Sequence, residues 1–342
     1  MKKLLNTLYV TSPDTYLGLD GENVIVKKED AVVLRIPIHN LEAIVAFNYV
    51  GASPALMRKC GEQGVSLSFF QGDRFCGRFV GQENGNVILR KTQYRVSDNE
   101  QDSLKIAKNM ILGKVHNARY VVDRALRDHA LRLDCDRMQK ASQYLKQSLR
   151  NIKESISLDQ LRGLEGEAAS IYFGVFDELI LQQKKDFMFS GRNKRPPLDN
   201  VNALLSFAYS LLTSECAGAA YSVGLDPYVG FLHRDRPGRQ SLALDLMEEL
   251  RAPVADRFVL TLINKQEIAG KGFKKMESGA VLLNDETRRL ILQKWQESKK
   301  EQVQHPFLKE KVQIGLLPYV QAMLLARYLR GDIDAYSPYF KR

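Results

Sequence analysis

The spacing of apolar residues changes once along the chain, near residue 95. Before that point, short segments rich in Val, Ile, Phe and Tyr are separated by Gly, Asn and Asp, which is typical of strands and tight turns. After it, apolar residues recur every three or four positions, which indicates amphipathic helices. We therefore predict an α+β protein of two domains: a small β-rich domain over residues 1–95 and a larger all-α domain over 96–342.

One helix is expected to interrupt the strands, at SPALMRKCGEQG. Ser53 is a typical N-cap, Pro54 suits the first helical turn, and Gly61 or Gly64 can end the helix.

The rest of the chain is assigned by the same patterns. Residues 86–94 (NVILRKTQY) are expected to form the last strand, and the polar stretch 96–103 is expected to be a linker. The main later helices are predicted over 136–152, 157–184, 199–222, 240–266, 284–302 and 308–330.

The charge balance favours a polyanionic partner. The chain has 50 Lys and Arg against 40 Asp and Glu, a net charge of +10, and phosphate contacts made by basic residues dominate nucleic-acid affinity. Many basic proteins bind no nucleic acid, so charge alone leaves this open. Four scattered Cys without a CxxC pair indicate neither a disulfide framework nor a zinc finger. Without a signal peptide or an apolar run of roughly 18 residues, a cytoplasmic protein is expected.

Three segments of the helical region carry candidate chemistry. In the first, LRGLEGEAASIYF, Glu165 is followed by small residues such as Gly166 and Ala168. Small neighbours permit close backbone approach at a crowded, buried site. An acid near the start of a helix is also stabilised by the helix dipole and then needs no functional role.

The second segment, GLDPYVGFLH, reads as an ordered loop that ends at His233. A lone histidine beside Phe231 and Leu232 is more often a packing residue than a metal ligand. The same holds for the other histidines, none of which has an acidic partner at a motif spacing: His39, His116, His129 and His305.

The third segment, SLALDLMEELR, places three acids in a helix that is otherwise apolar. Asp245 and Glu248 are three residues apart and share a face, and Glu249 lies beside them. A helix that is apolar on most sides is buried, where acids are costly unless they are paired or bind a cation. Ser241 as an N-cap would instead put the acids in the first turns, where the helix dipole stabilises them.

Together the three segments offer one Glu, one His and one further carboxylate. This nitrogen and oxygen donor set suits Mn²⁺ or Mg²⁺, whereas a structural zinc site would use more thiolate or imidazole. The chain has no His-Glu-x-x-His, P-loop, Gly-x-Ser-x-Gly or Gly-x-Gly-x-x-Gly motif. Metalloprotease, P-loop NTPase, hydrolase and dinucleotide-binding functions therefore lack support.

The same segments closely resemble the CRISPR-associated endonuclease/integrase of the adaptation module, the first Cas protein. LRGLEGEAASIYF resembles the Glu-Gly-x-Ala-Ala-x-x-Tyr-Phe segment of that family, and RPPLDNVNALLSFAYSLLTSEC resembles its Arg-Pro-Pro-x-Asp-x-x-Asn-x-x-Leu-Ser helix. GLDPYVGFLH and SLALDLMEELRAPVADRFVL resemble the stretch with its histidine and second carboxylate. The resemblance covers nearly the whole chain, and LLNTLYVTSPDTYLGLDGENVIV resembles the type I-C subtype.

The resemblance implies that Glu165, His233 and Glu248 are catalytic and bind a divalent metal, Mn²⁺ or Mg²⁺. It makes Asp245 a supporting neighbour of these ligands or an alternate ligand. Glu249 is expected to face solvent or to pair with a nearby base such as Arg251.

The function implied by the resemblance is a metal-dependent DNA integrase that inserts spacer DNA into CRISPR arrays in antiviral defence. The 3′-OH of a captured fragment would attack a phosphodiester at the repeat boundary, and water in its place would give endonuclease activity. Family members are homodimers that pair through the N-terminal domain and work with a companion, the second Cas protein. The best DNA-contacting candidates flank the motifs, although they could equally be solubilising loop charges: Arg192, Lys194, Arg195, Arg234, Arg236 and Arg239.

Two other functions are compatible with these residues. One is a dimeric DNA-binding scaffold whose acidic cluster is structural, although the intact Glu, His and Glu set argues against it. The other is a general metal-dependent DNA repair nuclease, which would use the same site but give no integrated product.

Overall fold

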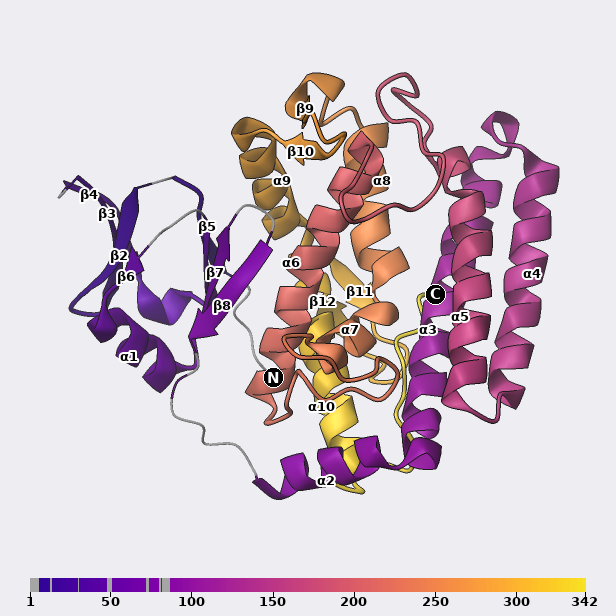
Figure 1. Ribbon diagram of the computed structural model, residues 1–342, viewed down its shortest axis with the longest axis horizontal. Coiled ribbons are helices and arrows are strands. Elements are labelled where there is room, and N and C mark those ends of the chain that lie inside the picture. The colour runs from indigo at the N-terminus through magenta and orange to yellow at the C-terminus, as the bar shows by residue number, and fades with distance from the viewer. Residues whose placement is uncertain are drawn as a thin grey trace. The chain divides into compact units, whose positions relative to one another are not determined.

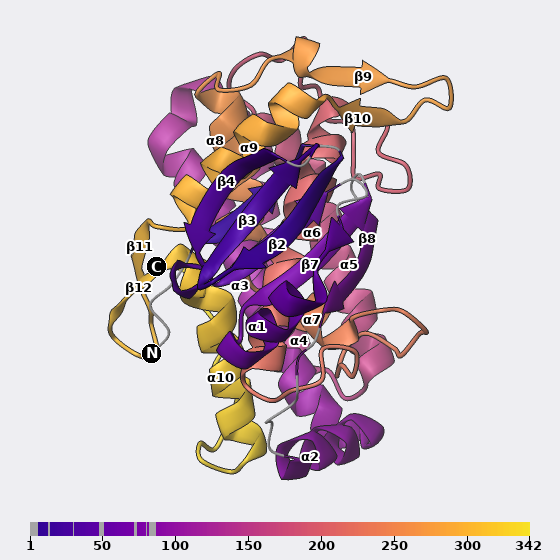
Figure 2. The same cartoon turned by 90° about the vertical axis from the view of Figure 1, so that its left-hand side faces the viewer.

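Two four-stranded sheets form the first part of the computed structural model (Figure 2). One sheet has the strand order β4–β3–β2–β6, in which β2, β3 and β4 form an antiparallel meander. The other has the order β1–β5–β7–β8, in which β1, β5 and β7 run parallel. The strands are β1 (Thr7–Val10), β2 (Thr15–Asp20), β3 (Asn23–Lys28), β4 (Ala31–Pro37), β5 (Ala43–Phe47), β6 (Gly51–Ala52), β7 (Ser66–Gln71) and β8 (Arg74–Phe79).

The chain divides into two compact units. The first comprises Met1–Gly85 and Arg288–Glu301, and the second comprises Asn86–Thr287 and Gln302–Arg342. The structure describes residues 6–12, 14–29, 31–47, 51–71, 74–79, 81 and 87–342.

The predicted helix among the strands is confirmed as α1 (Pro54–Gln63). The Ser53 side chain accepts a hydrogen bond from the Leu56 backbone N–H at 3.2 Å, as an N-cap does. The helix ends at Gly64, whose φ of 67° suits glycine, so Gly64 rather than Gly61 is the stop.

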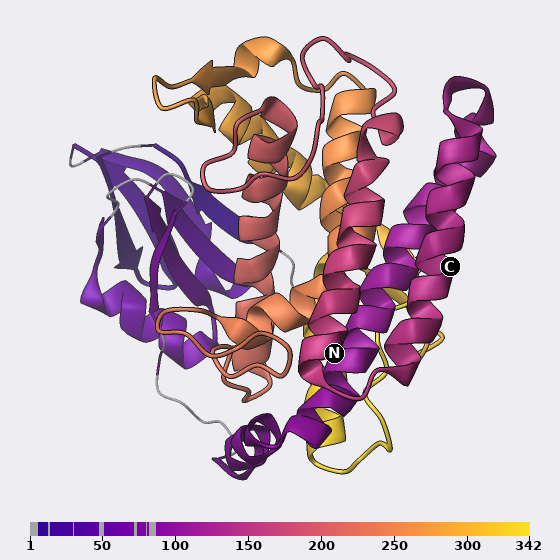
Figure 3. The same cartoon turned by 45° about the vertical axis from the view of Figure 1, so that its right-hand side comes forward.

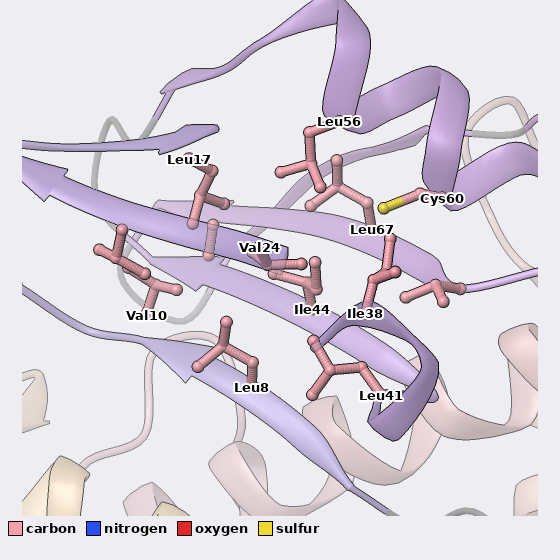
Figure 4. Packing of buried hydrophobic residues seen from close by; sticks show 13 residues of the cluster. Leu8, Val10, Leu17, Val24, Ile38, Leu41, Ile44, Leu56, Cys60 and Leu67 are labelled. Atoms are coloured by element: carbon pink, nitrogen blue, oxygen red, sulfur yellow. The ribbon is translucent and has the colours of Figure 1, made fainter. Parts of the chain in front are cut away.

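The core of the first unit lies between its sheets and α1. Leu56 and Cys60 of α1 point toward Leu67 of β7, and all three side chains are fully buried (Figure 4). Each buried leucine stabilises the fold by about 1.5–3 kcal/mol relative to an exposed one. The segment Arg288–Glu301, which holds most of α9 (Asp285–Ser298), also belongs to this unit.

Helices dominate the second unit (Figure 1). The long helices α3, α4 and α5 pack side by side, as Figure 3 shows. α6 packs against α7 and α10. The α-helices are α2 (Val87–Asp98), α3 (Glu100–His129), α4 (Cys135–Glu154), α5 (Leu158–Gly174), α6 (Asn200–Ser222), α7 (Ser241–Glu248), α8 (Arg257–Asn264) and α10 (Leu317–Leu329).

The α+β class and the order of a β-rich part before a helical part are confirmed. The boundary at residue 95 is wrong, because it falls inside α2 and the compact units separate before Val87. The description of the second part as all-α is also wrong, since it contains two hairpins. These are β9 (Phe273–Lys275) with β10 (Val281–Leu283), and β11 (Gln302–Gln304) with β12 (Lys311–Gln313).

The predicted strand 86–94 is a helix from Val87 onward, and Asn86 lies outside the described residues. The run Val-Ile-Leu suggested a strand, but Leu89 and Gln93 are buried at the four-residue spacing of a helix. The predicted linker 96–103 is likewise helical apart from Asn99, which caps α3 by accepting from the Asp102 backbone N–H. Polar capping residues there mark a helix start rather than a loop.

Four predicted helices are shorter or interrupted. The helix predicted over 157–184 ends at Gly174, where a short 3₁₀ turn follows. The helix predicted over 284–302 ends at Ser298. The helix predicted over 240–266 is split by a π-helix, Arg251–Asp256, which contains Pro253, a residue without a backbone N–H to donate. The last begins only at Leu317. No helix in the described ranges has the length and apolar character needed to cross a bilayer.

Candidate active site

Glu165 projects from the middle of α5, and its side chain is 26% exposed. The helix begins at Leu158 after the N-cap Ser157. The helix dipole stabilises acids only in the first turn, and Glu165 lies beyond that turn, so the dipole does not explain its presence. The expected close approach at Gly166 is wrong, since a Cβ added there would meet no atom within 4 Å. Glu165 is therefore a carboxylate at a site that is only partly enclosed.

His233 is held by Asp245 of α7. The Asp245 carboxylate accepts the backbone N–H groups of Phe231, Leu232 and His233 at 2.6, 3.0 and 3.1 Å. The His233 ring Nδ1 lies 2.6 Å from Asp245 Oδ1. Because a carboxylate with these contacts acts as an acceptor, Nδ1 carries the proton, and the Nε2 lone pair is left for another partner.

Glycine makes this arrangement possible. A Cβ on Gly230 would lie 2.7 Å from Asp245 Oδ2, so only glycine lets the loop reach the carboxylate. The loop is also tied to α2, since the buried Gln93 amide donates to the carbonyls of Asp226 and Val229, each at 2.8 Å. The predicted ordered loop is confirmed, but it does not end at His233, because it continues as far as residue 240, where α7 follows.

Glu248 is the last residue of α7 and is 3% exposed. Its Oε1 lies 2.8 Å from Arg251 Nη2 and 3.8 Å from His233 Nε2. Its Oε2 lies 2.7 Å from Lys114 Nζ. Burial alone would raise the pKa of Glu248, but the charges of Arg251 and Lys114 outweigh it and hold that pKa well below its ordinary value.

Lys114 of α3 connects the two candidate carboxylates. Its Nζ donates to Glu165 Oε1 and forms the ion pair with Glu248 Oε2. Glu165, His233 and Glu248 therefore lie around one place in the second unit. The three do not form a ready ligand cluster, because no group of three or more His, Cys, Asp or Glu side chains in the described part of the chain is arranged to hold a metal ion.

The residues nevertheless fit a divalent cation in their chemistry. A positive charge, the Lys114 ammonium, already lies between the carboxylates of Glu165 and Glu248. Glu248 Oε2 is buried and accepts no hydrogen bond of normal geometry, so it retains lone pairs. With the Nε2 of His233, these oxygens form the mixed donor set that Mn²⁺ and Mg²⁺ accept.

The helix that carries Glu248 is buried, as predicted, but two details of the prediction are wrong. Ser241 is not the N-cap, because the helix starts at Ser241 itself and its hydroxyl donates to the Arg234 carbonyl. Glu249 neither faces solvent nor pairs with Arg251. It is fully buried and accepts hydrogen bonds from the Tyr336 hydroxyl, the Gln321 amide and the Tyr339 backbone N–H.

The predicted DNA-contacting residues differ in their surroundings. Lys194, Arg195, Arg234 and Arg236 are exposed, and Arg234 pairs with Asp159 at 2.8 Å. The Arg192 guanidinium is engaged inside the unit, where it donates to Asn202 Oδ1 at 2.6 Å and Ser206 Oγ at 3.2 Å.

Arg239 is partly buried and within electrostatic range of the site. Partial burial and the charge of Arg236 lower the pKa of Arg239, and the negative charges of Asp245 and Glu248 oppose that change. The loop that follows His233 therefore carries several cationic side chains, of which Arg239 interacts electrostatically with Glu248.

The sequence did not predict that Lys114 and Arg251 both pair with Glu248. Arg251 contacts Glu248 and lies over the Tyr209 ring, 5.2 Å from its centroid. A signal for Lys114 was present, because it continues the buried face of α3 formed by Met110, Ala118 and their neighbours at helical spacing. A lysine on a core-facing stripe requires an acidic partner.

Comparison with known proteins gives the family. A family model described as CRISPR associated protein Cas1 matches residues 8–297. The chain is 50% identical over 345 residues to the CRISPR-associated endonuclease Cas1 2 of Rhodospirillum rubrum, with 99% of each chain covered. It is 46% identical over 343 residues to the CRISPR-associated endonuclease Cas1 1 of Chlorobaculum tepidum, with 100% of each covered.

A solved CAS1 protein from Thermotoga maritima has a similar fold, with a TM-score of 0.81 at 24% identity, covering 95% of this chain and 97% of that one. At that identity the structural likeness speaks for the fold. The family model and the two full-length relatives carry the assignment: the chain belongs to the Cas1 family of CRISPR-associated endonucleases.

Proposed function

We propose that this chain is a metal-dependent DNA integrase and endonuclease that inserts spacer DNA into CRISPR arrays. The 3′-OH of a DNA fragment attacks the phosphodiester at the repeat boundary, and water in its place cleaves the strand. The observation that carries the proposal is that Glu165, His233 and Glu248, from three separate segments, surround one cationic position that Lys114 reaches.

Glu165, Glu248 and the Nε2 of His233 would hold the divalent cation, Mn²⁺ or Mg²⁺. When bound, the cation supplies charge stabilisation at the phosphate oxygens and lowers the pKa of the attacking hydroxyl. Asp245 fixes the tautomer and direction of the His233 ring, and this makes it a supporting residue rather than a ligand. Arg251 holds Glu248 in its ionised form.

DNA is the proposed substrate, and the exposed cations beside the site are the proposed contacts. Four of the candidates are exposed to solvent: Lys194, Arg195, Arg234 and Arg236. Arg239 interacts electrostatically with Asp245 and Glu248. Arg192 is a weaker candidate because its guanidinium already binds Asn202 and Ser206. Each phosphate contact adds salt-dependent affinity without sequence preference.

Homodimerisation through the N-terminal domain is supported by the edge strand β4. Val32, Val33 and Leu34 are 46%, 58% and 40% exposed on that strand, which pairs with β3 on one side. An apolar edge strand is a template for pairing with another chain. We further propose the second Cas protein as companion, the type I-C subtype, and a cytoplasmic location, where the cell's own CRISPR array lies.

The test combines the purified protein, its companion, Mn²⁺ or Mg²⁺, a short duplex and a plasmid that carries a repeat. Wild type should join the duplex to the repeat boundary. Glu165→Ala, His233→Ala and Glu248→Ala should each remain folded and lose joining. Glu167→Ala is the matched control, since Glu167 is an exposed acid two residues along the same helix.

The products separate the alternatives. Cleaved strands without branched or integrated products would identify a repair nuclease. Salt-sensitive DNA binding without turnover would identify a scaffold. Full joining by any of the three alanine variants would remove that residue from the site.

A further inference from the structure

Lys114 occupies the position proposed for the metal ion. The reaction proposed above gives this lysine no chemical task. Its side chain is 13% exposed, and its Nζ touches both Glu165 Oε1 and Glu248 Oε2, the latter at 2.7 Å. An ammonium between two carboxylates occupies the position that a shared metal ion would take. A lysine and a metal ion at that position exclude one another, because like charges at contact distance repel strongly in a partly buried site.

The backbone beneath Lys114 is locked in place. A Cβ on Gly113 would lie 2.9 Å from Glu249 Cβ and 3.1 Å from Pro338 Cβ, so α3 approaches the end of α7 as closely as glycine allows. One turn along α3, the Asn117 amide donates to the carbonyls of Glu249 and Tyr339, each at 2.7 Å. Because the helix is fixed, release of the ammonium from the carboxylates would have to come from rotation of the Lys114 side chain rather than from movement of α3.

The side chain is suited to such an exchange. Lysine carries a compact charge with three donors on a flexible four-carbon stem, whereas an arginine fork holds a carboxylate in fixed geometry. The second cation on Glu248 is Arg251, which binds the other oxygen, Oε1, at 2.8 Å. Displacement of Lys114 thus leaves Glu248 with Arg251 still in place and its Oε2 open to a metal ion.

We infer that Lys114 is a built-in counter-ion that competes with the metal for Glu165 and Glu248. It holds the two carboxylates together when no metal is bound, and it releases them when the metal binds. The released ammonium then lies at the edge of the site as a donor to a phosphate oxygen of the DNA. This inference rests on the proposed metal-dependent function and deepens it, because it makes Lys114 set the metal concentration at which the enzyme becomes active.

The experiment measures Mn²⁺ binding to the full chain without DNA, by titration calorimetry and by the electron paramagnetic resonance signal of free Mn²⁺. Lys114→Met removes the charge and keeps the length of the side chain. It should bind Mn²⁺ about tenfold more tightly than wild type, or ~1.4 kcal/mol. Lys105→Met is the matched control, because Lys105 is an exposed lysine of the same helix that pairs with Asp102 at 2.8 Å, and its Mn²⁺ affinity should equal that of wild type.

Melting temperatures and a charge-conserving variant distinguish the counter-ion role from a general effect of the substitution on folding. In EDTA, Lys114→Met should melt at a lower temperature than wild type, since the buried Glu248 loses a cation. Saturating Mn²⁺ should then raise its melting temperature by more than it raises that of wild type. Lys114→Arg keeps the charge and should bind Mn²⁺ no more tightly than wild type, even if Lys114→Met does not fold.

The outcomes distinguish this inference from the function on which it rests. If wild type binds Mn²⁺ and Glu165→Gln abolishes the binding, the metal site stands. In that case, equal or weaker Mn²⁺ binding by Lys114→Met, or tighter binding by Lys114→Arg, overturns the counter-ion role alone. If wild type binds no Mn²⁺, the metal site and the counter-ion role both fail.

Discussion

Glu248 and Glu249 are neighbours in the chain, and both are buried at the end of α7, with exposed fractions of 3% and 0%. Glu248 faces the charges of Arg251 and Lys114, which hold its pKa well below the ordinary value despite burial. Glu249 faces only neutral donors, so burial dominates and raises its pKa to about 7. Two equally buried carboxyl groups therefore have pKa values shifted in opposite directions, because one has cationic partners and the other has neutral partners.

The two environments come from different parts of the chain. Lys114 and Arg251 face the candidate metal position, where an ionised carboxylate is useful. Glu249 instead binds the C-terminal segment through the Tyr336 hydroxyl and the Tyr339 backbone N–H. One acid is thus placed for chemistry and the other for attachment of the C-terminus, a difference that substitution can test.

The largest expected effect is on activity. Glu248→Gln should reduce joining and cleavage rates by more than ~100-fold, because loss of a residue that merely supports a metal ligand already costs ~10–100-fold. Glu249→Gln should stay within about tenfold of wild type, measured well below its melting temperature. Equal losses in the two variants would erase the functional distinction between them.

The next effect is on stability. Glu249→Ala should lower the free energy of unfolding by ~3 kcal/mol, because it leaves two buried donors, the Tyr336 hydroxyl and the Tyr339 backbone N–H, without an acceptor. Urea unfolding followed by circular dichroism measures the loss. Glu277→Ala, at an exposed acid of the same unit, should change stability by less than ~0.5 kcal/mol. A loss below ~1 kcal/mol in Glu249→Ala would show that the C-terminal segment is held by other contacts.

The third effect is a dependence on pH with a defined sign. The folded pKa of Glu249, about 7, exceeds its ordinary 4.5, so its contribution to stability is complete below pH 4.5 and is lost as pH rises to about 7. The stability of wild type relative to Glu249→Gln should therefore fall by ~3 kcal/mol across that window. Glu248 acts in the opposite sense, because its lowered pKa gives stability above pH 4.5 that is lost in more acidic solution. A relative stability that is flat from pH 4.5 to 7 would contradict the raised pKa.

The smallest effect concerns a single hydroxyl. Tyr336→Phe removes one donor to Glu249 and should cost ~1 kcal/mol. Because that donor lowers the pKa of Glu249, its removal should raise the pKa further and make the cost larger at pH 8 than at pH 5. Unfolding measured at both pH values checks this, and a cost that is larger at pH 5 would reverse the assigned role of the hydroxyl.

Local patterns were sufficient for much of the fold. The caps of α1 at Ser53 and Gly64 were readable because capping depends on neighbouring backbone groups. The change from strands to helices was readable because each element has its own period. Periodicity gave the wrong element for α2, because the buried face of that helix includes a polar residue, Gln93. The hydrogen-bond partners of Gln93 are carbonyls of a loop that is distant in sequence.

The sequence by itself determined the family and the order of a β-rich part before a helical part. It also identified the candidate site residues, Glu165, His233, Asp245 and Glu248. Tertiary structure alone decided the environment of each acid. It brought Lys114 between two carboxylates, and it enclosed Glu249 with Tyr336 and Tyr339. The physical reason is that helix periodicity and capping act over a few residues. The charge state of a buried acid depends instead on desolvation and on partners that only the folded chain brings into contact.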